Sequence, residues 1–149
     1  MADHDDVPIP ALLRASRGAY AHAVQRRLAA AGFDDLPRSG PFVLGGMANH
    51  GASAGDLVRQ LGVTKQATGQ LVDTLVARGY LERRPDPDDR RRMVIELTPR
   101  GRAAAAEVRE AVQGVDADLA RRLSPAQLAG LRAGLVALCD IRDAFEKES

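Results

Sequence analysis

One change of hydrophobic period constrains this chain more than any other feature. Up to Gly79, apolar residues recur at the three- and four-residue spacings of amphipathic helices. From 80 to 97 the spacing becomes two, in two short runs separated by the Pro- and Asp-rich loop 85–92. Thr98-Pro99 then supplies a helix cap and a first-turn proline, so a long helix should begin there. The sequence therefore predicts a mainly α fold with one small β-hairpin.

Capping residues divide the helical parts into segments. Ser or Thr at a helix start accepts a hydrogen bond from an unpaired backbone N–H, and Gly after a helix end adopts a left-handed conformation. These signals place helices over 10–31, 39–51, 53–61 and 64–78, from 98 onward and from 124 onward. In the second of these helices, Gly45 and Gly46 are expected to pack closely against a neighbouring backbone.

The order of elements in the middle of the chain has a functional meaning. Two helices joined by a tight turn at Gly62 form a helix-turn-helix signature, and a hairpin directly after the second helix is a wing. In such a module the N-terminal half of the second helix enters the major groove of DNA, and the wing extends to the side of that helix along the duplex. We therefore expect a winged helix-turn-helix lobe over 37–97.

The side chains at the start of the second helix suit this role. Those expected to face outward can form hydrogen bonds to bases or phosphates, and none is acidic. Gly69 lets the helix approach the duplex closely. The expected DNA-binding residues of the helices are Ser53, Thr64, Lys65, Gln66, Thr68 and Gln70.

The hairpin loop adds a second candidate surface, formed by Arg90, Arg91 and Arg92 beside three aspartates. Arginines on a slender loop suit the minor groove, whose negative potential attracts guanidinium groups. Aspartates repel phosphate, so Asp89 is predicted to fix an arginine side chain by an ion pair. The alternative is a solvated loop that only protects a sheet edge from aggregation.

The residues from Leu61 to Arg91 and from Val94 to Gly101 resemble the MarR family of bacterial regulators. Asp89-Arg90-Arg91 matches the family's wing pattern of Asp, any residue, then Arg. The Leu-Thr and the Gly that follow the wing in the family match Leu97, Thr98 and Gly101. The similarity is strong over the middle half of the chain and rests on helix pattern alone in the flanks.

This resemblance implies a homodimer that represses, or less often activates, promoters with pseudo-palindromic operators. It implies that Thr64, Lys65, Gln66, Thr68 and Gln70 contact bases and phosphates, and that Arg91 enters the minor groove, oriented by Asp89. The chain of 149 residues then forms a single domain, with 10–36 and 98–149 as its helical dimerisation region. Leucines spaced by three and four favour a dimer interface over a seam within one chain. The expected interface residues are Leu13, Leu119, Leu128, Leu131, Leu135 and Leu138.

The resemblance also implies release from DNA by a small aromatic or phenolic acid, or by oxidation. Candidates to line an effector cavity, between the dimer helices and the DNA-binding lobe, are Tyr20, Phe42, Met47 and His50. The single cysteine, Cys139, lies in an apolar helix and is expected to be a buried, inert thiol. Neither His22 nor His50 has a partner at metal-ligand spacing, so no metal and no cofactor are expected.

Other classes of function find little support. The sequence has no Gly-rich phosphate loop and no nucleophile elbow, so we do not expect an enzyme. It has no signal peptide and no apolar run near the roughly 18 residues of a membrane span, which favours a cytoplasmic protein with no membrane partner. The remaining alternative is a winged-helix protein-interaction module that does not bind DNA.

Overall fold

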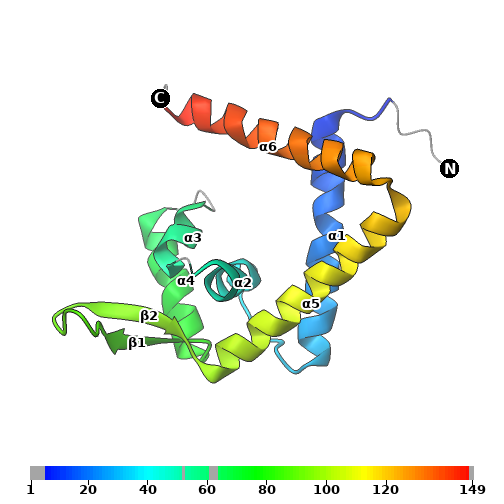
Figure 1. Cartoon of the computed structure of the whole chain (residues 1–149). Helices are drawn as coiled ribbons and strands as arrows, with labels where there is room; N and C mark the ends of the chain where they lie inside the picture. Colours follow the sequence, from blue (N-terminus) through cyan, green and yellow to red (C-terminus); the bar gives the residue numbers. More distant parts are fainter. Residues whose placement is uncertain (1–5, 52, 61–63, 148–149) are drawn as a thin grey trace. The chain divides into compact units, whose positions relative to one another are not determined.

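A computed structural model describes residues 6–51, 53–60 and 64–147 (Figure 1). The described residues form six helices and one antiparallel hairpin, which confirms the predicted fold class. The elements are α1 (Ile9–Ala30), α2 (Gly40–His50), α3 (Ala54–Gln60), α4 (Lys65–Ala77), β1 (Leu81–Pro85), β2 (Met93–Leu97), α5 (Pro99–Arg122) and α6 (Pro125–Lys147).

The contacts divide the chain into two compact units, residues 1–112 and 113–149. The first unit holds α1 to α4, the hairpin and the first half of α5. The second unit holds the rest of α5 and all of α6. The predicted division into a lobe over 37–97 and a dimerisation region over 10–36 and 98–149 stays a prediction.

Local capping chemistry begins several helices where the sequence indicated, but Ser39, the expected cap of α2, makes no side-chain capping hydrogen bond. The Thr64 hydroxyl oxygen accepts a hydrogen bond from the Ala67 N–H at 3.2 Å, which opens α4. Ser124 and Gln127 cap α6 reciprocally, at 3.2 and 2.9 Å. Gly79 ends the turn after α4 with a φ of +77°. The turn residues Leu61, Gly62 and Val63 lie outside the described residues.

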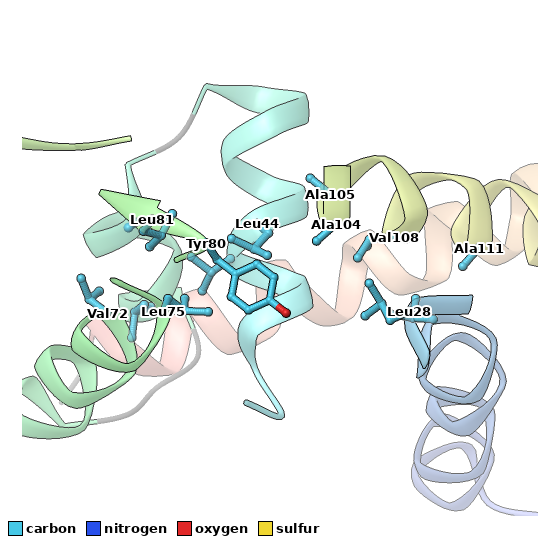
Figure 2. Packing of buried hydrophobic residues seen from close by; sticks show 14 residues of the cluster. Leu28, Leu44, Val72, Leu75, Tyr80, Leu81, Ala104, Ala105, Val108 and Ala111 are labelled. Atoms are coloured by element: carbon cyan, nitrogen blue, oxygen red, sulfur yellow. The ribbon is translucent and has the colours of Figure 1, made fainter. Parts of the chain in front are cut away.

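The core of the first unit is built around α2 and Tyr80, which follows the C-terminal end of α4. Tyr80, Leu44 and Leu75 have no exposed surface, and they come from three different parts of the chain. Figure 2 shows the Tyr80 ring among these apolar side chains with its hydroxyl pointing out of the cluster. The sequence placed Tyr80 in the first strand, but β1 begins at Leu81, and Tyr80 is instead among the largest fully buried side chains.

Helix α1 belongs to the same core through its C-terminal half. Leu28 is 3% exposed and faces Val108 and Ala111 of α5 (Figure 2). Beside this contact, the Arg27 guanidinium pairs with the Glu107 carboxylate at 2.6 Å. The two helices are therefore joined by apolar contact and by charge.

The predicted packing of Gly45 and Gly46 against a neighbouring backbone is wrong. A Cβ at Gly46 would meet the Leu57 side chain at 2.5 Å, and one at Gly45 would meet Val108 at 3.4 Å, so side chains rather than a backbone occupy that space. The close backbone approach lies at Gly101, where a Cβ would stand 2.0 Å from the Tyr80 carbonyl oxygen. Glycine at this position lets α5 start directly against the base of the hairpin.

Helix α6 of the second unit differs, because none of its residues is buried. Leu131, Leu135 and Leu138 are each 41% exposed. Cys139 is exposed as well, which corrects the expectation of a buried thiol. That expectation equated an apolar helix with a buried one, whereas no residue of α6 is buried.

Candidate nucleic-acid interface

One face of α4 is exposed and carries polar side chains. Lys65, Gln66, Gly69 and Gln70 lie on it, and we call these four residues the readout face. Helical periodicity places them on one side of the helix. Among the described residues, no atom outside the local helix backbone lies within 4 Å of a Cβ built at Gly69, so the surface there is open. The readout face is therefore accessible to a macromolecular partner.

Three other predicted DNA-binding side chains are engaged within the protein. Thr64 caps α4, and the half-buried Thr68 hydroxyl donates to the Thr64 carbonyl oxygen at 2.9 Å. Ser53 accepts from the Asp56 N–H at 3.1 Å and donates to the Asp56 carboxylate at 2.6 Å, capping α3. These residues support the two helices of the module. Their contacts with DNA stay a prediction.

The wing comprises β1, β2 and the loop between them. Leu81 pairs with Leu97 at its base and Pro85 with Met93 at its tip, in antiparallel register. The hairpin projects away from the helices of the first unit, with the loop at its far end (Figure 1).

The aspartates of the wing loop shape its backbone. The Asp89 carboxylate accepts from the Arg91 N–H at 3.1 Å, and the Asp86 carboxylate accepts from the Asp88 N–H at 2.9 Å. Such Asx turns stabilise a tight loop. Within the described residues Asp89 pairs with no arginine side chain, so it orients Arg91 through the backbone instead of the expected ion pair.

The wing arginines fall into two groups by their partners. Arg83 pairs with Asp73 of α4 at 2.5 Å, and Arg84 pairs with Glu82 at 2.8 Å. In the part of the chain that the structure describes, Arg90, Arg91 and Arg92 pair with no carboxylate, and all three are exposed. We call these three the tip arginines. Their charges remain available to an anionic partner.

A polar cluster at the base of the wing was missed by sequence reasoning. The Tyr80 hydroxyl donates to the Asp35 carboxylate, and the Arg100 guanidinium donates to both, at 3.0 Å each. The hydrogen bond from Tyr80, helped by Arg100, lowers the pKa of Asp35. Burial and the bond to Asp35 raise the pKa of Tyr80. Nothing in the loop sequence signals that Asp35 meets residues 45 and 65 positions further along.

The candidate effector residues lie on two helices of the first unit. Tyr20 is on α1, and Phe42, Met47 and His50 are on α2. Phe42 is 46% exposed, Met47 packs against the core, and His50 is exposed in the last turn of α2. The cavity that they are expected to line stays a prediction.

Two other features are absent from the described residues. No three His, Cys, Asp or Glu side chains there are grouped so that they could hold a metal ion. No helix there has both the length and the apolar character that crossing a membrane requires.

A family model and individual relatives both relate this chain to the MarR family. A family model described as the MarR family matches residues 34–92. The chain is 31% identical over 77 residues to the multiple antibiotic resistance protein MarR of Escherichia coli, covering 51% of this chain and 54% of that protein. It spans about half the length of the curated relatives it matches.

Solved structures extend the similarity to almost the whole chain. The crystal structure of RV1404 from Mycobacterium tuberculosis is 33% identical, with a TM-score of 0.64 over 91% of this chain and 92% of that one. The S. aureus MepR–DNA complex has a TM-score of 0.71 over 91% of this chain and 98% of that one. At 19% identity the latter shows the shared fold alone.

Proposed function

Because the chain belongs to the MarR family of transcription regulators, we propose that it binds double-stranded DNA as a homodimer through α4 and the wing. Its operator is a pseudo-palindrome with half-sites about one helical turn apart. A chromosomal target places its action in the cytoplasm. Family members regulate transcription, so the expectation that the chain is not an enzyme is confirmed.

One observation carries the DNA-binding proposal. The first unit presents two exposed surfaces of the kinds that DNA needs: the hydrogen-bonding readout face and the unpaired tip arginines. Gln and Lys side chains recognise base edges in the major groove, and arginines on a narrow hairpin suit the minor groove. A protein of the same fold, S. aureus MepR, has been solved in complex with DNA, which supports the proposal that this chain binds DNA.

The homodimer is proposed from the second unit. Leu131, Leu135 and Leu138 form a seam at helical spacing, and Ile141 and Phe145 continue the apolar surface at 53% and 65% exposure. Contiguous exposed apolar surface of this kind marks an interaction site. A second copy of the chain supplies the same seam, as a two-fold dimer requires.

The proposal extends to the mode of regulation. We infer repression with release by a small aromatic or phenolic acid, on the family resemblance and on the candidate residues Tyr20, Phe42, Met47 and His50. A thermal-shift screen of such acids tests it. An acid that raises the melting temperature and also weakens DNA binding supports the inference. A screen in which none does both contradicts it.

Gel-shift titration of the duplex that flanks the protein's own gene tests the DNA-binding proposal. Arg91→Ala is expected to weaken operator binding and leave the dimer intact, because it removes only an exposed tip charge. Gln66→Ala is expected to relax base preference by about 1–3 kcal/mol at the preferred site. Arg109→Ala, which removes an exposed arginine of α5, serves as the matched control and should bind as the wild type does.

Wild-type affinity in the Arg91→Ala variant would exclude the minor-groove role of the wing. If the wild-type protein fails to bind any duplex and its dimer instead captures a protein partner, the interaction-module alternative holds.

A further inference from the structure

The exposed side of α4 does not end with the readout face. One turn beyond Gln70, the same side of the helix carries Asp73, whose side chain is 66% exposed. A carboxylate on this side faces the same partner as Lys65 and Gln66. If that partner is DNA, an unpaired Asp73 repels the phosphates.

The structure gives this carboxylate a single cationic partner from the wing. The Arg83 guanidinium lies 2.5 Å from the Asp73 carboxylate oxygen, as both a hydrogen bond and an ion pair. Arg83 is two residues after the buried Leu81, so strand alternation places both side chains on the side of β1 that packs against α4. The pair thus connects the exposed side of the helix to the strand of the wing.

The neighbouring arginine shows that this connection is specific. Arg84 points to the other side of β1 and pairs within the hairpin, with Glu82 at 2.8 Å and Glu96 at 3.8 Å. Arg83 and Arg84 therefore have the same charge and adjacent positions but different surroundings. Only Arg83 is held beside the readout face.

We propose that Asp73 is a positioning residue and Arg83 a specificity-determining one: the pair fixes the Arg83 guanidinium between α4 and the wing, where it binds one backbone phosphate in a set register. This inference rests on the proposed DNA-binding function. A guanidinium has five N–H donors, and a carboxylate engages only part of them. The rest remain for a phosphate, and the side chain of Arg83 is still 44% exposed.

Exposed ion pairs of this kind contribute little to folding. A role in positioning can therefore be separated from a role in stability. The experiment measures affinity for the operator and for an unrelated duplex over a range of salt concentrations, with melting temperature as the check on folding.

Arg83→Gln is expected to reduce the salt slope of operator binding by about one phosphate, near 0.9 in log–log units. Arg83→Lys keeps the charge and the slope, but it lowers the ratio of operator to non-specific affinity by about fivefold, because an ammonium lacks the planar fork. Asp73→Asn raises non-specific affinity and lowers the same ratio by about fivefold, because the guanidinium loses its anchor.

Arg84→Gln is the matched control, since it removes the same charge from the next residue. It should leave the ratio within about twofold of wild type, as an ordinary surface substitution does. All four variants should melt within a few degrees of the wild type.

Two results overturn the inference. One is an Arg83→Gln salt slope equal to that of the wild type. The other is an Asp73→Asn variant whose operator and non-specific affinities rise by the same factor, because Asp73 then acts only as a charge. If the wild-type protein binds no duplex at low salt, the proposed DNA-binding function itself is wrong. If the wild-type protein binds its operator with a salt-dependent affinity and the variants have the same slope and affinity ratio, only the proposed role of the Asp73–Arg83 pair is wrong.

Discussion

Helix α6 and the helices around α2 are both rich in leucine, valine and alanine, yet they bury these side chains to opposite extents. In the first unit, Val43 and Leu44 of α2 have no exposed surface. In α6, Leu131 and Leu135 remain 41% exposed, and no residue of the helix is buried. The same pattern therefore produces a closed core in one unit and an open apolar seam in the other. The difference fits the proposed homodimer, in which the core of the first unit closes within one chain and a second copy covers the seam of α6.

The largest expected effect tests the open seam. Carboxylates introduced by Leu131→Glu with Leu135→Glu should weaken self-association by more than about 100-fold, because each copy would bury two unpaired charges. Light scattering at micromolar concentration should then give the mass of one chain. Ala129→Glu with Ala133→Glu puts the same charges on the opposite side of α6 and should leave the dimer mass unchanged. A dimer mass for the leucine variant would show that the seam is not the interface.

The next effect tests the closed core, with two glycines of α5. A Cβ at Gly101 stands 2.0 Å from the Tyr80 carbonyl oxygen, so Gly101→Ala should lower the free energy of unfolding by about 3 kcal/mol. In the part of the chain that the structure describes, no atom outside the local helix backbone lies within 4 Å of a Cβ built at Gly114 of the second unit. Gly114→Ala should instead raise that free energy by up to about 1 kcal/mol, the difference in helix propensity. Urea unfolding measures both changes, and equal effects would remove the contrast between the units.

The smallest effect is on the pH dependence of stability, and it concerns the polar cluster of Asp35, Tyr80 and Arg100 in the first unit. The pKa of Asp35 is lowered by the hydrogen bond from Tyr80 and by Arg100, so its ionised form stabilises the folded state. This contribution is complete above its ordinary value of 3.8 and is lost as the pH falls through the lowered value. The melting temperature of Asp35→Asn should therefore fall less steeply below that pH than that of the wild type. Asp34→Asn, at the exposed neighbour, should follow the wild type, and parallel curves for all three proteins would refute the role of the cluster.

Features that depend on neighbours in the sequence could be predicted from it. The Thr64, Thr98 and Ser124 caps act within one turn of helix, and all three begin helices as expected. The hairpin followed from its alternating pattern and its proline-rich loop. These features rest on backbone groups that a nearby side chain can satisfy.

Features that depend on distant residues could not be predicted. Asp35 meets Tyr80 and Arg100 only after the core has formed, and Gly101 meets the Tyr80 carbonyl for the same reason. Cys139 was expected to be buried because its helix is apolar, but an apolar pattern does not say which chain will cover it. The pairing of Asp73 with Arg83 likewise joins two elements whose contact no local pattern reveals.

The central claim is that each copy folds its own first unit and that the α6 seams of two copies join them into a dimer. Hydroxyl-radical footprinting of the wild-type protein on its operator tests this claim most directly. Two lobes brought together by α6 should protect two patches on the same side of the duplex, with centres about 10 base pairs apart. A single protected patch, or no protection at a concentration where the protein is a dimer, would contradict the account.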